Sequence, residues 1–163
     1  MKYFAYGSNM SSKRLRARTH SARPIGVYAL PGFALRFHKV GKDGSGKCDA
    51  FRTGDAADRV VGVLYDLDPA DEAPLDRVEG LGWGYRKAQV EVEGPGGDLE
   101  RAFTYCAIRI DPSLRPYSWY LEHVLAGARE AGLPAQYVAE IARQGATPDP
   151  CEDRERAELA IYA

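Results

Sequence analysis

The chain has few of the residues from which disulfide frameworks, metal sites and membrane spans are built. Its three cysteines lie far apart and form no Cys-x-x-Cys pair, which fits reduced thiols in a cytoplasm. The three histidines form neither His-x-x-x-His nor His-Glu-x-x-His, so no metal site is expected. Each histidine is interpreted as a surface or half-buried residue. No apolar run approaches the ~20 residues that a bilayer span needs.

Charge of one sign is also lacking, because the net charge of the 163 residues is −1. Such a balance gives no bulk attraction to nucleic acid or to an anionic membrane. A content of 45% apolar and 28% charged residues is typical of a soluble globular protein. The length predicts a single domain over residues 1–163. Turn residues follow Met1 to Phe4 too soon for a signal peptide, so a cytoplasmic location is expected.

Short segments rich in β-branched and aromatic residues predict strands in the first two thirds of the chain. They cover residues 23–30, 33–40, 59–67, 85–93 and 99–110, with a flexible tip expected over residues 41–47 and a hairpin turn over 94–98. Helices are predicted over residues 11–17, from Asp68-Pro69 to Gly80, and through most of the last third of the chain. This order argues for an α+β fold, with a small mixed β-barrel or a strongly curved sheet and flanking helices.

The segment from Tyr3 to Met10 is the first candidate for function. An aromatic strand leads into Gly7-Ser8-Asn9, a turn that opens a helical stretch. Gly7 can adopt positive φ and lets the backbone approach a ligand closely. Free N–H groups at the helix start suit a carboxylate or a developing oxyanion. The alternative is a plain strand and tight turn, with Asn9 or Ser8 as a helix cap.

Glu79 is the second candidate, because it ends the helix that begins at Pro69. A carboxylate at this position meets the negative end of the helix dipole, where Lys or Arg would be favourable. We expect this mismatch, and any burial, to raise its proton affinity so that it exchanges a proton near neutral pH. The alternative is a solvated surface glutamate.

Three motifs carry a resemblance to a known family. The segment Tyr3-Phe4-Ala5-Tyr6-Gly7-Ser8-Asn9-Met10 resembles the N-terminal signature of the γ-glutamylcyclotransferase family, including its AIG2-like branches. The segment Leu75-Asp76-Arg77-Val78-Glu79-Gly80 resembles that family's catalytic-glutamate motif. Tyr120, together with residues 127–134, resembles its C-terminal helix and following turn. The motifs occur in family order and span nearly the whole chain.

The resemblance implies a small mixed β-barrel with a pocket at one end. Family members release an amino acid or amine from a γ-glutamyl compound, form 5-oxoproline and use no cofactor. Glu79 would be the catalytic acid and base. The resemblance implies these substrate-binding residues: Tyr3, Phe4, Ala5, Tyr6, Gly7, Ser8, Tyr85 and Tyr120. The expected partner is a small-molecule γ-glutamyl substrate, with no nucleic acid and no membrane, in a monomer or homodimer.

Several alternatives stay open. The enzyme could be a γ-glutamylamine cyclotransferase, or it could remove a γ-glutamyl protecting group in a biosynthetic pathway. Trp83 is interpreted either as a residue at the pocket mouth or as an exposed aromatic residue on a loop. A barrel that only binds small metabolites or a protein partner has no need for Glu79 at that helix end. The basic residues between Lys13 and Arg23 form a candidate nucleic-acid patch without an accompanying motif. Ser8 lacks the Gly-x-Ser-x-Gly context of a nucleophile and is interpreted as a hydrogen-bonding loop residue.

Overall fold

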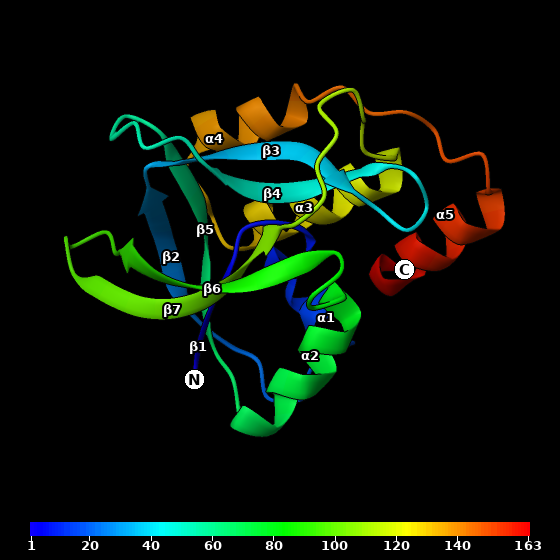
Figure 1. The fold of residues 1–163 in the computed structure, drawn as a ribbon. Helices are drawn as coiled ribbons and strands as arrows, with labels where there is room; N and C mark the ends of the chain where they lie inside the picture. The colour runs from blue at the N-terminus through cyan, green and yellow to red at the C-terminus, as the bar shows by residue number, and fades with distance from the viewer.

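Five strands close into a barrel in the order β1-β5-β2-β6-β7 in the computed structural model, which describes residues 1–163 (Figure 1). The strands are β1 (Lys2–Ala5), β2 (Arg23–Pro31), β5 (Arg59–Asp66), β6 (Tyr85–Glu93) and β7 (Leu99–Ala107). Neighbours pair antiparallel except β1 and β7, which meet in parallel at Tyr3 and Phe103 and complete the circle. The expected α+β class is confirmed, and of the two expected forms the chain adopts the barrel.

A separate hairpin, β3 (Phe33–Val40) and β4 (Gly46–Arg52), lies across one end of the barrel (Figure 1). Residues 41–47, expected as a flexible tip between strand-like segments, form a turn that runs into the first residues of β4. The Gly41 N–H donates to the Ser45 carbonyl at 2.9 Å. The Asp43 carboxylate accepts from the Ser45 N–H at 2.9 Å and from Lys47 Nζ at 2.8 Å. These bonds stabilise the turn.

The helices begin and end near the predicted positions. They are η1 (Ser8–Met10), α1 (Ser12–Arg16), η2 (Pro69–Asp71), α2 (Glu72–Glu79), α3 (Ser118–Glu130), α4 (Ala135–Ala142), α5 (Glu152–Leu159) and η3 (Ala160–Tyr162). The Asp68 side chain caps the turn at Pro69 by accepting from the Ala70 N–H at 2.8 Å. Gly80, at φ 66°, ends α2 in the left-handed conformation that favours glycine. No helix combines the length and the hydropathy that a bilayer span requires.

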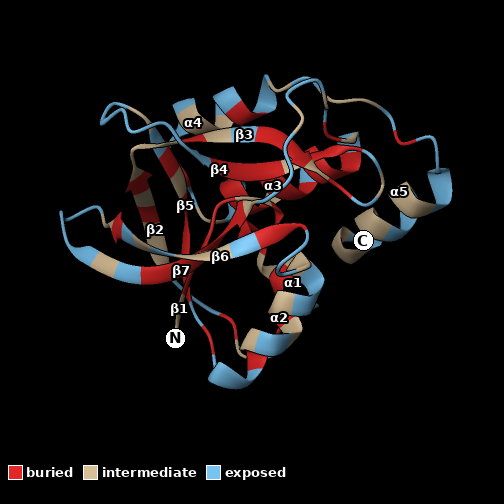
Figure 2. Ribbon diagram, viewed as in Figure 1, coloured by how far each residue is buried: buried red, intermediate tan, exposed pale blue.

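Burial is concentrated on the inward faces of the strands and on α3, whereas α5 has no buried residue (Figure 2). Two buried histidines depart from the surface or half-buried interpretation, which is wrong for both. His123 on α3 is fully buried, with Arg14 Nη1 2.9 Å from its Nε2. His38 is buried with its Nε2 2.8 Å from Asp49 Oδ2. Each has a polar partner from another segment, which makes its burial tolerable.

Candidate active site

Glu79 lies at the C-terminal end of α2 with its side chain turned into the protein. The side chain is only 13% exposed, so the alternative of a solvated surface glutamate is wrong. Its Oε1 accepts from Asn9 Nδ2 at 2.9 Å and from Arg18 Nη1 at 3.2 Å. Both donors stabilise the charged carboxylate and fix its orientation. The second oxygen, Oε2, accepts no hydrogen bond from the protein and is free for a ligand.

The turn after β1 forms the opposite wall of the site. Gly7 has φ −116°, so the expected use of positive φ is wrong. Glycine is required there for close approach, since a Cβ on Gly7 would lie 2.9 Å from Cys48 Cβ and 3.5 Å from Tyr120 Oη. The Gly7 N–H donates to no group in the protein, and the first residues of η1 have no acceptor within their helix. The turn therefore offers main-chain donors to the pocket.

Tyrosine hydroxyls surround the pocket and are held by main-chain and amide groups. Tyr120 Oη accepts from the Cys48 N–H at 3.0 Å, and Tyr85 Oη donates to the Cys48 carbonyl at 2.7 Å. Asn9 Nδ2 donates to Tyr3 Oη at 3.0 Å. Burial, with the Glu79 carboxylate as a further cause, raises the pKa of Tyr3, Tyr85 and Tyr120 well above the ordinary tyrosine value. These hydroxyls therefore remain neutral hydrogen-bonding groups.

These residues enclose a small inner pocket of about 30 Å³. Ten residues line it: Tyr3, Tyr6, Gly7, Ser8, Asn9, Cys48, Glu79, Tyr85, Tyr105 and Tyr120. It opens into an outer pocket of about 230 Å³, here called the vestibule, and the two share Ser8, Glu79, Tyr85 and Tyr120. Because the two pockets share these four residues, a ligand in the inner pocket can extend into the vestibule.

The structure brings together most of the predicted site residues, but not all. Glu79 lines the inner pocket, and so do six of the expected substrate-binding residues: Tyr3, Tyr6, Gly7, Ser8, Tyr85 and Tyr120. Phe4 and Ala5 do not line it, because both are buried in the barrel core. Of the ten lining residues, Asn9, Cys48 and Tyr105 were not predicted. Asn9 could have been found, since it belongs to the N-terminal motif, whereas Cys48 and Tyr105 carry no local signal.

The structure places Trp83 and the basic stretch near the pockets. Trp83 lines the vestibule and is 46% exposed, as expected for a residue at the pocket mouth. Of the five basic residues between Lys13 and Arg23, two form ion pairs within the protein. Arg14 pairs with Glu158 on α5, and Arg18 pairs with Glu79. No cluster of three or more His, Cys, Asp and Glu side chains is placed to ligate a metal ion.

Comparison with known proteins points in the same direction as the fold and the pocket. The model of the AIG2-like family matches residues 59–141. The γ-glutamylcyclotransferases of Bos taurus and Homo sapiens are each 31% identical over 141 residues, which cover 83% of this chain and 73% of each relative. A solved γ-glutamyl cyclotransferase structure is 26% identical with a TM-score of 0.82 and covers 96% of this chain and 98% of its own. An uncharacterized human protein of solved structure reaches a TM-score of 0.81 at 26% identity, covering 95% and 97%.

The protein is a γ-glutamylcyclotransferase-like enzyme. This class follows from the closed barrel, the carboxylate in the pocket and the similarities to known proteins. More particularly, the chain belongs to the AIG2-like family, whose model covers the chain continuously from the start of β5 to residue 141 in α4. Glu79, Tyr85 and Tyr120 lie inside that matched region, and the Gly7 turn lies outside it.

Proposed function

We propose that the protein converts a γ-glutamyl compound into 5-oxoproline and releases the attached amino acid or amine. The α-amino nitrogen attacks the γ-carbonyl carbon of the same molecule, which forms the lactam bond and breaks the bond to the leaving nitrogen. The α-ammonium gives up two protons in this reaction, and the leaving nitrogen gains two. No cofactor or co-reactant is needed for this balance.

The position of Glu79 is the observation that carries the proposal. Its Oε1 is held by Asn9 and Arg18, and its free Oε2 faces the pocket as a proton acceptor. Glu79 takes a proton from the α-ammonium, which generates the nucleophilic amine, and returns a proton to the departing nitrogen. One carboxylate thus serves both as base and as acid.

The Gly7 turn and the tyrosines supply the remaining chemistry. The free N–H of Gly7 is a donor for the oxygen that becomes negative in the tetrahedral intermediate. Neutral hydroxyls of Tyr3 and Tyr120 line the same pocket and offer further polar contacts to the substrate. The narrow pocket favours the folded glutamyl chain in which the amine reaches the γ-carbonyl, and such positioning supplies much of the rate.

A panel of γ-glutamyl compounds tests the proposal. The purified protein is incubated with γ-glutamyl amino acids, γ-glutamyl amines and glutathione, and 5-oxoproline is quantified. Formation of 5-oxoproline together with one equivalent of the free amine supports the proposal. Release of free glutamate would show hydrolysis instead of cyclisation. Absence of product from every compound would favour a barrel that only binds metabolites.

A further inference from the structure

The vestibule carries more positive than negative charge, although the whole chain is nearly neutral. Five basic side chains line it: Arg14, Arg18, Lys39, Lys42 and Lys47. Three carboxylates line it: Asp43, Glu79 and Glu158. The surplus at this one opening is therefore two positive charges, 5 − 3.

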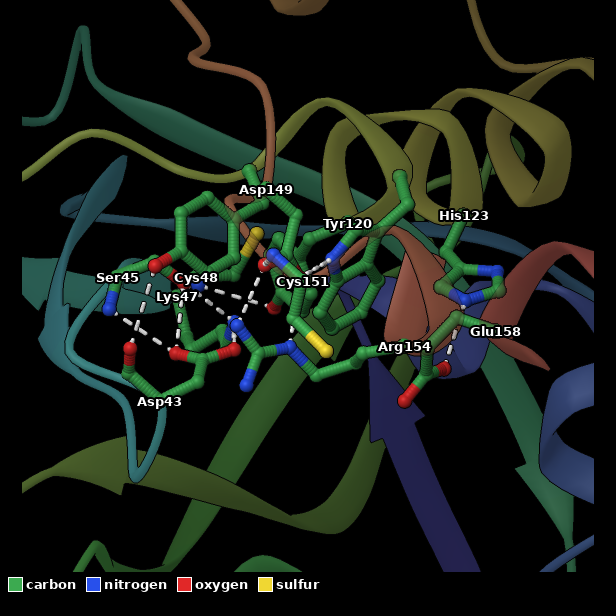
Figure 3. A network of polar contacts seen from close by, with 12 residues as sticks. Asp43, Ser45, Lys47, Cys48, Tyr120, His123, Asp149, Cys151, Arg154 and Glu158 are labelled. Atoms are coloured by element: carbon green, nitrogen blue, oxygen red, sulfur yellow. Dashed lines mark hydrogen bonds and ion pairs between the residues drawn. The ribbon is translucent and has the colours of Figure 1, made fainter. Parts of the chain in front are cut away.

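Each of the three carboxylates already has a basic partner within the protein. Asp43 pairs with Lys47 at 2.8 Å, inside the turn between β3 and β4 (Figure 3). Glu158 on α5 pairs with Arg14 at 2.5 Å. Glu79 pairs with Arg18 at 3.2 Å. Lys39 and Lys42 are the two basic residues left over.

Lys42 is exposed to water, whereas Lys39 is only 6% exposed. Lys39 takes part in none of the ion pairs or side-chain hydrogen bonds of the protein, and its Nζ lies 4.6 Å from the centre of the Tyr85 ring. Burial lowers the pKa of Lys39, while the Glu79 carboxylate acts in the opposite direction. The side chain of Lys39 is largely covered, but its ammonium reaches solvent in the vestibule and has no carboxylate partner there. A bound anion would give the Lys39 ammonium the charge partner that the protein does not provide.

The location of Lys39 indicates which part of a substrate brings the anion. Lys39 lines the vestibule and does not line the inner pocket, whereas Glu79, Ser8 and Tyr85 line both. A γ-glutamyl compound with its reacting carbonyl between Glu79 and Ser8 places its leaving group outward, along the wall formed by Tyr85 and Lys39.

We propose that Lys39 binds a carboxylate on the leaving group, so that the substrates are γ-glutamyl amino acids or γ-glutamyl peptides rather than γ-glutamyl amines. This inference rests on the cyclotransferase activity proposed above. Lys39 is a specificity residue in this scheme and takes no part in the proton transfers.

Two substrates that differ only in the carboxylate test this inference. γ-Glutamylalanine and γ-glutamylethylamine have the same reacting groups and the same two-carbon leaving chain, but only the first carries the anion. A charge-assisted hydrogen bond corresponds to a discrimination of about 10- to 100-fold. The wild-type protein should therefore favour γ-glutamylalanine, and Lys39→Met should lower its kcat/KM ratio of γ-glutamylalanine to γ-glutamylethylamine by about 10- to 100-fold.

Lys13→Met is the matched control, because it removes one positive charge from an exposed side chain that does not line the vestibule. It should leave the ratio between the two substrates unchanged. Lys39→Gln is a second charge-removing variant, to be used if the Met variant does not fold. An equal loss of kcat/KM for both substrates would overturn the inference, since Lys39 would then contact the glutamyl part. A ratio of kcat/KM values that Lys39→Met leaves unchanged would also overturn the inference. The proposed cyclotransferase activity would still be supported in that case if the wild-type protein forms 5-oxoproline.

Discussion

The substitution Glu79→Gln tests the proposed mechanism most directly. Glutamine has nearly the same shape as glutamate, and its amide oxygen can still accept from Asn9 and Arg18 in place of Oε1. The amide nitrogen then takes the place of Oε2, which faces the pocket. The variant therefore keeps the packing and the hydrogen bonds of the site but cannot accept a proton.

The expected loss of activity is much larger than the expected loss of stability. Removal of a general acid and base costs about 10²- to 10⁴-fold in kcat, which equals about 3–5 kcal/mol. The hydrogen bond from Arg18 becomes a bond to a neutral acceptor, which costs about 1 kcal/mol because charged hydrogen bonds are roughly twice as strong as neutral ones. In a domain of this size, 1 kcal/mol lowers the Tm by about 2–4 °C.

Quantification of 5-oxoproline from γ-glutamylalanine gives kcat and KM for both forms, and thermal unfolding gives the Tm. We expect a lower kcat with a similar KM, because Glu79 acts on the protons and not on the rest of the substrate. Glu72→Gln is the matched control. Glu72 lies on the same helix, pairs with Lys87 at 2.5 Å and does not line the pocket, so this variant should retain its activity.

A Glu79→Gln variant with more than about one tenth of the wild-type kcat would refute the reasoning, because a general base contributes about 100-fold or more. A variant that lost its activity only because it was unfolded would leave normal kinetics in its folded fraction, and that result would also remove Glu79 from the mechanism.

Three further predictions concern other residues of the two pockets. Lys39→Met keeps the length of the side chain and removes a charge that makes no ion pair, so thermal unfolding should show a Tm within a few degrees of the wild type, and a larger loss would contradict this. Hydrogen bonds from His123 and then Arg14 lower the pKa of Glu158 from 4.5 to about 2. The stabilisation from Glu158 is therefore complete above pH ~4.5 and lost as the pH falls to about 2, so denaturant unfolding should show Glu158→Gln to be less stable at pH 7 and equally stable near pH 2. Tyr120→Phe removes the acceptor of the Cys48 N–H and should lower the free energy of unfolding by about 1–3 kcal/mol. The same variant should weaken substrate use, and unchanged kinetics in the folded protein would indicate a purely structural role for Tyr120.

Local signals in the sequence were enough to place the helix that carries Glu79. Asp68-Pro69 starts it and Gly80 ends it, and both signals act through bonds and backbone angles within a few residues. The hairpin of β6 and β7 is predictable for the same reason, because its turn and its strands are continuous in the chain. Strand β4 was expected only as a strand-like segment after residue 47, without bounds, and the partners of the buried Asp49 in its centre, His38 and the Ala107 N–H, come from other strands.

The composition of the site depended on contacts that no local pattern contains. Gly7 was expected to need an unusual backbone angle, but it is required by the proximity of Cys48, a residue on another element. Arg18 was grouped with its basic neighbours, and only the folded chain shows that it pairs with Glu79. A net charge of −1 likewise conceals the positive vestibule, because opposite charges elsewhere on the surface cancel it in the sum.

The contribution of α5 to the vestibule has a consequence for the order in which the two pockets are completed. Tyr3 lines the inner pocket and Glu158 lines the vestibule, so the walls come from segments that are far apart in the chain. A nascent chain that has already closed its barrel would still lack the ion pair that holds Arg14. The outer wall of the vestibule is therefore completed only when α5 has been synthesised and has docked against Arg14.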